Sequence, residues 1–264
     1  MRNEPTLRLA LFLGVFVAMA LWEHAAPRRA LSLARAARWP GNLGIGVINT
    51  LALRLLFPAA AVGFALLAAR HGWGLFQYLR LPMAVEVVLS VIVLDLVLYL
   101  QHRALHRVPL LWRLHRVHHT DLDMDVTTGV RFHPLEIVLS MLIKAVAVIL
   151  LGASPPAVLA FEALLNATSM FNHGNVAISP RIDRPLRLLV VTPDMHRIHH
   201  SAETGETDSN FGFNLPWWDR CLGTYREAPR GGHGGMRIGL RQPRDPLLCT
   251  HLAGLLRMPL GRVE

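Results

Sequence analysis

Long apolar runs, separated by polar stretches rich in arginine, constrain this chain more than any other feature of its sequence. Of its 264 residues, 52% are hydrophobic and only 17% are charged, whereas a soluble domain carries about 25% charged residues. Apolar residues gathered into runs of this length are what insertion into a bilayer requires. The pattern excludes a disordered chain and predicts an all-α membrane protein, a single membrane domain that comprises residues 1–264.

We expect each apolar run to form a helix. The runs cover residues 7–22, 43–69, 83–100, 135–151 and 157–171. The first run is expected to be a retained span rather than a cleaved signal peptide, because arginines follow it immediately. Arg54 and Pro58 interrupt the second run, which is therefore either a kinked span or a re-entrant segment. Glycine and prolines between the fourth and fifth runs predict a tight turn and a helical hairpin.

The distribution of arginine predicts the orientation in the membrane. The net charge is +9 and all but one of the 27 basic residues are arginine, with four of them in the expected loop 23–42. Such loops stay in the cytoplasm, so residues 101–134 and 172–264, including a tail at 227–264, are also expected there. In a bacterium this is the inner membrane. Because the arginines lie between apolar runs, the basic charge does not predict nucleic-acid binding.

Three histidine clusters lie on this predicted cytoplasmic side. They have the spacings HxxxH, HxxHH and HxxHH, and consist of His102 and His106; His115, His118 and His119; His196, His199 and His200. A spacing of four places two imidazoles on one helix face. Neutral imidazole binds iron, copper, zinc and nickel, and eight imidazoles exceed the three or four protein ligands of one zinc ion. The clusters therefore predict a helical cap that holds a site for two metals.

Other polar residues near the clusters are candidates for the same site. His173, at the end of the fifth run, is either a ligand or a residue that supports one. His133, which opens the fourth run, is either a ligand or a helix-start residue. Metal-bound histidines need a partner for their other ring nitrogen, and the candidate carboxylates are Asp95, Glu136 and Asp194. We expect Asp121, Asp123 and Asp125 to be solvated, and His24, His71, His233 and His251 to take no part.

These motifs together resemble the fatty acid hydroxylase / sterol desaturase superfamily, whose members are integral-membrane histidine-box oxygenases. The resemblance covers roughly residues 90–226 and includes the elements 172–175, 192–201 and 210–219. It implies a non-haem di-iron centre, molecular oxygen as the oxidant and a lipid substrate that enters from the bilayer. It also implies that the eight clustered histidines and His173 are the metal ligands. Zinc is expected to replace iron on overexpression.

The implied activity is hydroxylation or desaturation of a C–H bond in a fatty acyl, sterol-like or ether lipid. No segment carries a nicotinamide- or flavin-binding fingerprint, so we expect electrons from a separate donor protein of the ferredoxin or haem-protein type. An arginine-rich face suits an acidic donor. The alternative is a metal-binding membrane protein or transporter without oxidase activity. A transporter would place its ionisable ligands near the bilayer midplane, whereas these clusters follow the ends of the apolar runs.

Overall fold

The structure, a computed structural model, describes residues 4–261, and within that range all regular secondary structure is helical apart from two isolated bridges. The all-α prediction is therefore confirmed. The long helices are α1 (Glu4–Ala25), α2 (Arg35–Leu56), α3 (Ala60–His71), α5 (Met83–Arg107), α7 (Pro134–Leu151) and α8 (Pro155–Asn172). The short helices are α4 (Leu75–Leu79), α6 (Pro109–His119), η1 (Val126–Val130), α9 (Pro180–Leu186), α10 (Pro193–His199), α11 (Thr204–Thr207), α12 (Trp217–Cys221), α13 (Gly232–Gly235), α14 (Pro246–Thr250), α15 (Leu252–Arg257) and η2 (Met258–Leu260).

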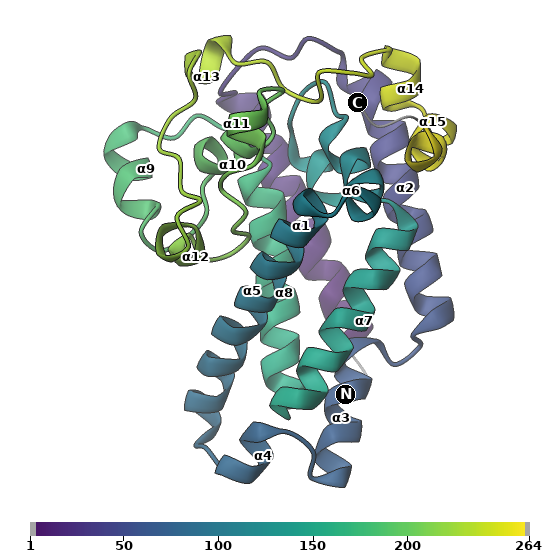
Figure 1. Cartoon of the computed structure of the whole chain (residues 1–264), viewed down its shortest axis with the longest axis vertical. Coiled ribbons are helices and arrows are strands. Elements are labelled where there is room, and N and C mark those ends of the chain that lie inside the picture. The colour runs from purple at the N-terminus through teal and green to yellow at the C-terminus, as the bar shows by residue number, and fades with distance from the viewer. Residues whose placement is uncertain (1–3, 262–264) are drawn as a thin grey trace.

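The long helices form a bundle along the long axis of the molecule, and most of the short ones gather at one end as a cap (Figure 1). Helix α4 lies at the opposite end of the bundle (Figure 1). Helix α8 packs against α1, α3 and α5. The C-terminal helices α14 and α15 pack on α2, so this part of the predicted tail is folded onto the bundle.

Four helical segments of the described chain are long and apolar enough to cross a membrane. They are Thr6–Ala25, Arg35–His71, Met83–Arg107 and Pro134–Leu151. Their outward faces carry large apolar side chains, such as Leu55 and Leu150, which are 81% and 68% exposed. A surface of this kind needs an apolar solvent. Helix α8 covers the predicted fifth run but is not among the four, and it carries polar side chains such as Glu162 and Thr168.

The turns between the long helices follow from local sequence signals. Helix α2 ends at Leu56 and α3 begins at Ala60, so the interruption expected at Pro58 is present. Gly152 ends α7 with a φ of 67°, a left-handed conformation that glycine adopts without steric cost. The hydroxyl of Ser154 then accepts a hydrogen bond from the Ala157 amide at the start of α8. The hairpin predicted for the fourth and fifth runs is therefore formed by α7 and α8.

The start of α2 and the burial of the aspartates after His119 both differ from expectation, because the two segments bond to each other. Helix α2 begins at Arg35 rather than after residue 42, and the Arg38 side chain is fully buried. It donates to both carboxylate oxygens of Asp121, at 2.7 and 2.8 Å, and to Asp125 at 2.6 Å. Asp123 accepts from the backbone amides of Ser32 and Leu33. The expectation that these aspartates are solvated is wrong, because each is buried against groups from the α1–α2 region.

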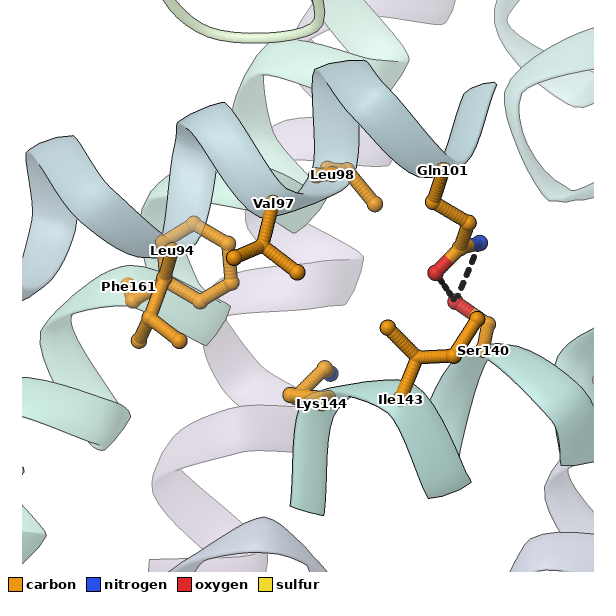
Figure 2. A pocket seen from close by; sticks show the side chains of 8 residues that line it. All are labelled: Leu94, Val97, Leu98, Gln101, Ser140, Ile143, Lys144 and Phe161. Atoms are coloured by element: carbon orange, nitrogen blue, oxygen red, sulfur yellow. Dashed lines mark hydrogen bonds between the residues drawn. The ribbon is translucent and has the colours of Figure 1, made fainter. Parts of the chain in front are cut away.

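A second set of charges lies within the bundle. Glu162 on α8 pairs with Lys144 on α7 at 2.9 Å and with Arg8 on α1 at 2.7 Å. Lys144 also lines a small pocket between α5, α7 and α8, shown in Figure 2. The remaining lining is mostly apolar, and a hydrogen bond of 3.0 Å joins Gln101 to Ser140 at one edge of it (Figure 2).

Candidate metal centre

Nine histidines from four parts of the chain meet at the cap end of the bundle. They come from the end of α5, from α6, from the residue after α8, and from α10 with the residue that follows it. They form two groups, and within each group the potential ligand atoms lie within 4.8 Å of one another. The first, called here the five-histidine group, is His102, His106, His115, His119 and His199; the second, the four-histidine group, is His118, His173, His196 and His200. The structure thus brings together all eight clustered histidines and His173.

Helix periodicity explains how α5 contributes to the site. Asp95, Tyr99, His102 and His106 are spaced by four, three and four residues, so they share one face of α5. Proline at the first position of α6 lets a new helix begin directly after α5 ends. Because α6 packs on the end of α5, its histidines meet those of α5.

The hydrogen bonds of six histidines define which ring nitrogen faces inward. In each, Nδ1 lies near an oxygen outside the cluster: the carbonyl of Phe211 for His102 (2.7 Å), Asp208 for His106 (3.3 Å), Glu136 for His115 (2.8 Å), the carbonyl of Arg131 for His118 (3.2 Å), the carbonyl of Ser169 for His173 (2.6 Å) and the carbonyl of Ser209 for His199 (2.8 Å). A carbonyl or carboxylate oxygen only accepts, so Nδ1 carries the proton and donates. In a neutral imidazole, Nε2 is then left with a bare lone pair.

These bare nitrogens face one another inside the cluster. The Nε2 atoms of His102 and His115 are 3.0 Å apart, and those of His118 and His173 are also 3.0 Å apart. Two lone pairs at this distance repel unless a cation lies between them. The Nε2 atoms of His106 and His199 are buried without any hydrogen-bond partner. Buried polar atoms without partners are costly in a folded protein, so the donor set fits two metal ions, one in each group.

Burial keeps six imidazoles of the cap neutral. Loss of hydration lowers the pKa of His199 to about 3 and that of His173 to about 4. The same desolvation, with repulsion from neighbouring histidines, holds the pKa of His118, His119, His196 and His200 well below the usual value. Desolvation disfavours the charged form of a buried base. These side chains therefore present lone pairs, as metal ligation requires.

The three candidate carboxylates take different places. Glu136 is in direct contact with the site, because it accepts the His115 Nδ1 proton. Asp95 touches no histidine of the cluster; it accepts from the Asn214 and Leu215 amides and from the indole of Trp218. Asp194 bonds Arg28 and Arg197.

The other histidines lie outside both groups. His133 caps α7, where its Nδ1 accepts from the Leu135 amide at 3.2 Å. His233 lies 3.6 Å from Asp194, so it has a charged neighbour that its sequence context did not reveal. His24, His71 and His251 are exposed.

Several groups that accept hydrogen bonds from the histidines carry no signal in the sequence. The carbonyls of Ser209 and Phe211 and the carboxylate of Asp208 are examples, and all three come from the segment that follows α10. A backbone carbonyl leaves no signature in side-chain type. Asp208 lies 102 residues from its partner His106, beyond the reach of any spacing argument.

Comparison with known proteins agrees with this geometry. The model of the fatty acid hydroxylase family matches residues 87–224, which is just over half of the chain and includes all nine histidines. The chain belongs to the fatty acid hydroxylase family. With its apolar helices, it is an integral membrane protein.

Several curated proteins of related sequence are enzymes that act on lipids or long-chain compounds. The ornithine lipid hydroxylase OlsE of Rhizobium tropici is 36% identical over 149 residues, which cover 56% of this chain and 44% of that protein. The human alkylglycerol monooxygenase is 30% identical over 127 residues, 48% of this chain and 27% of the enzyme. A very-long-chain aldehyde decarbonylase of Oryza sativa is 26% identical over 166 residues, 60% of this chain and 26% of that protein. The chain thus matches less than half the length of these relatives. No solved structure matches it significantly.

Proposed function

We propose that this protein is a di-iron monooxygenase that hydroxylates a C–H bond of a membrane lipid, with O2 as the oxidant. The observation that carries the proposal is the pair of histidine groups, whose bare Nε2 atoms face one another without donors between them. Nitrogen-rich ligation without thiolate suits iron. The hydroxylase and monooxygenase names of the relatives favour hydroxylation over desaturation.

The stoichiometry of hydroxylation determines which other reactants the site needs besides the lipid. One oxygen atom enters the C–H bond and the other leaves as water, which consumes two electrons and two protons. A bound pair of ferrous ions would supply the activation of O2. The electrons come from a separate, acidic one-electron carrier, for which the arginine-rich chain is a complementary partner.

The chain's own residues hold this chemistry in place. The acceptors on Nδ1 keep each imidazole in one tautomer and one orientation. Burial of the cluster excludes water from the reacting centre. The substrate's alkyl chain can approach along the apolar spans, because α5, which carries His102 and His106 near its end, is itself one of them. We place the cluster on the cytoplasmic side of the membrane, as the arginine distribution predicts.

Metal analysis of the protein purified in detergent from iron-supplemented cells tests the assignment. We expect about two iron ions per chain. His199→Ala in the five-histidine group and His200→Ala in the four-histidine group should each lose about one, and both should abolish the lipid product. His251→Ala, which changes an exposed histidine outside both groups, is the matched control.

Two outcomes would overturn the proposal. One is a wild-type protein that holds a single ion, or two ions that both variants retain. The other is a fully loaded protein whose expression leaves the lipids of the host unchanged while it alters cellular metal content, which would favour the transporter.

A further inference from the structure

We propose that the segment from Ser209 to Leu215 is a clamp that fixes the tautomers of His102 and His199, and that Asp95 and Asp219 are positioning residues that hold this clamp. The inference rests on the metal assignment proposed above. The segment supplies two of the Nδ1 acceptors, the carbonyl of Ser209 for His199 and that of Phe211 for His102. Both histidines belong to the five-histidine group.

Asp219 holds the middle of the clamp. Its carboxylate is fully buried and accepts from the amides of Phe211 and Gly212, both at 2.8 Å. The Thr224 hydroxyl donates to the same carboxylate at 2.7 Å. The amide that Asp219 holds belongs to Phe211, whose carbonyl accepts the proton of His102. The carboxylate therefore sets the position of that carbonyl.

The contacts form a closed ring that begins and ends on α5. Because the Thr224 hydroxyl donates to Asp219, it accepts from the hydroxyl of Tyr99 at 2.8 Å. Tyr99 is fully buried and lies three residues before His102 on the same helix face. Hydrogen bonds thus connect the clamp to α5, the helix that carries His102.

Asp95 holds the end of the clamp from the same face of α5. Its oxygens accept from the amides of Asn214 and Leu215, each at 3.2 Å, and from the Trp218 indole at 2.8 Å. An isolated carboxylate in this apolar bundle would be costly. These three donors compensate the buried charge of Asp95. Asp95 lies seven residues, or two helical turns, before His102 on α5.

The clamp should act on one metal position and not on the other. In the four-histidine group, the carbonyls of Ser169 and Arg131, which lie outside residues 209–215, accept from Nδ1 of His173 and of His118. Nδ1 of His196 and of His200 has no hydrogen-bond partner, so residues 209–215 hold no Nδ1 atom of this group. Disturbing the clamp is therefore expected to weaken metal binding in the five-histidine group alone. A purely structural role would instead reduce thermal stability and affect both positions together.

Zinc titration of the purified, iron-depleted protein against a competing chelator tests this prediction, because it reads metal affinity without turnover. Asp219→Asn places an amide NH2 against one of the two backbone N–H groups. We expect one of the two zinc affinities to fall by about 10–100-fold, the usual effect of losing a group that orients a ligand. The other affinity and the melting temperature should stay near the wild-type values. Asp183→Asn, which changes a buried acid paired with Arg187, is the control.

Gly212→Ala tests the clamp from its other side and leaves Asp219 intact. A Cβ at residue 212 would lie 2.9 Å from an Asp219 carboxylate oxygen and 2.8 Å from the Leu215 carbonyl. This displaces the segment, so the same single affinity should fall. The clamp proposal would be overturned if both variants kept two wild-type zinc affinities, or if both zinc affinities fell equally. A wild-type protein that binds fewer than two zinc ions would instead count against the proposed function.

Discussion

Replacing Arg38 by methionine tests the buried charge network that Arg38 forms with Asp121 and Asp125. The guanidinium of Arg38 bonds Asp121 through two nitrogens and Asp125 through a third, and all three side chains are fully buried. Methionine preserves much of the volume but removes the charge and every donor. Two carboxylates then remain in the interior, with Arg131, 3.9 Å from Asp121, as a remaining buried cation nearby.

The expected loss follows from the cost of an uncompensated buried charge. Removing one partner of a buried ion pair typically costs about 3–5 kcal/mol. For a chain of this size, 1 kcal/mol corresponds to roughly 2–4 °C in melting temperature. Arg38→Met should therefore melt about 6–20 °C below the wild type. Asp121 lies two residues after His119, so we also expect the variant to lose bound metal.

Thermal unfolding in detergent, followed by the fraction of monodisperse protein that survives heating, measures this effect. Arg181→Met removes an exposed arginine and should melt within about 2 °C of the wild type, since surface substitutions usually change stability by less than about 0.5 kcal/mol. Equal melting temperatures for the Arg38 and Arg181 variants would show that the network does not stabilise the cap, and the reasoning from burial would be wrong.

Three further predictions concern the ligands and the orientation. Alanine at any clustered histidine or at His173 should abolish lipid oxidation while membrane insertion persists, whereas His133→Ala should reduce activity less. The amount of lipid product in whole cells, normalised to inserted protein, measures both effects. Near-normal activity after loss of two clustered histidines would refute the site. Glu136→Ala removes the acceptor of His115 and should weaken one of the two zinc affinities by about 10–100-fold in chelator competition; an unchanged affinity would show that the contact does not support a ligand. Cys221 is exposed in the cap while Cys249 is buried, so an impermeant thiol reagent should label the wild-type protein only in inside-out vesicles. The variant Tyr78→Cys, in α4 at the opposite end, should be labelled in intact cells. The reverse pattern would show that the cap lies outside the cytoplasm.

The sequence carried enough information to predict the helices and the clustering of the histidines. Apolar runs of membrane-spanning length specify the bundle, because hydrocarbon leaves the backbone no partner outside a helix. Histidines four residues apart share a helix face whatever the tertiary structure, so HxxxH and HxxHH predicted clustering. The break at Pro58 is a local effect of the same kind.

Long-range contacts lay beyond prediction. Arg38 and Asp121 are 83 residues apart, and His102 and the Phe211 carbonyl are 109 apart. Alternating aspartates after a helix have the composition of a solvated loop, and only the folded α2 shows that they are buried. The division of nine histidines into five and four likewise depends on which rings meet across the fold, such as His199 with His119 and His200 with His118, and no spacing within one helix records this.

Isotope incorporation shows whether the protein transfers an oxygen atom from O2 to a lipid. Cells that express the protein are grown under O2 labelled with oxygen-18, and their lipids are compared by mass spectrometry with those of cells expressing the double variant His199→Ala, His200→Ala. We expect a hydroxylated lipid that carries one oxygen-18 atom, present with the wild type and absent with the variant. A hydroxylated lipid whose oxygen comes from water, or one that persists in the variant, would contradict it.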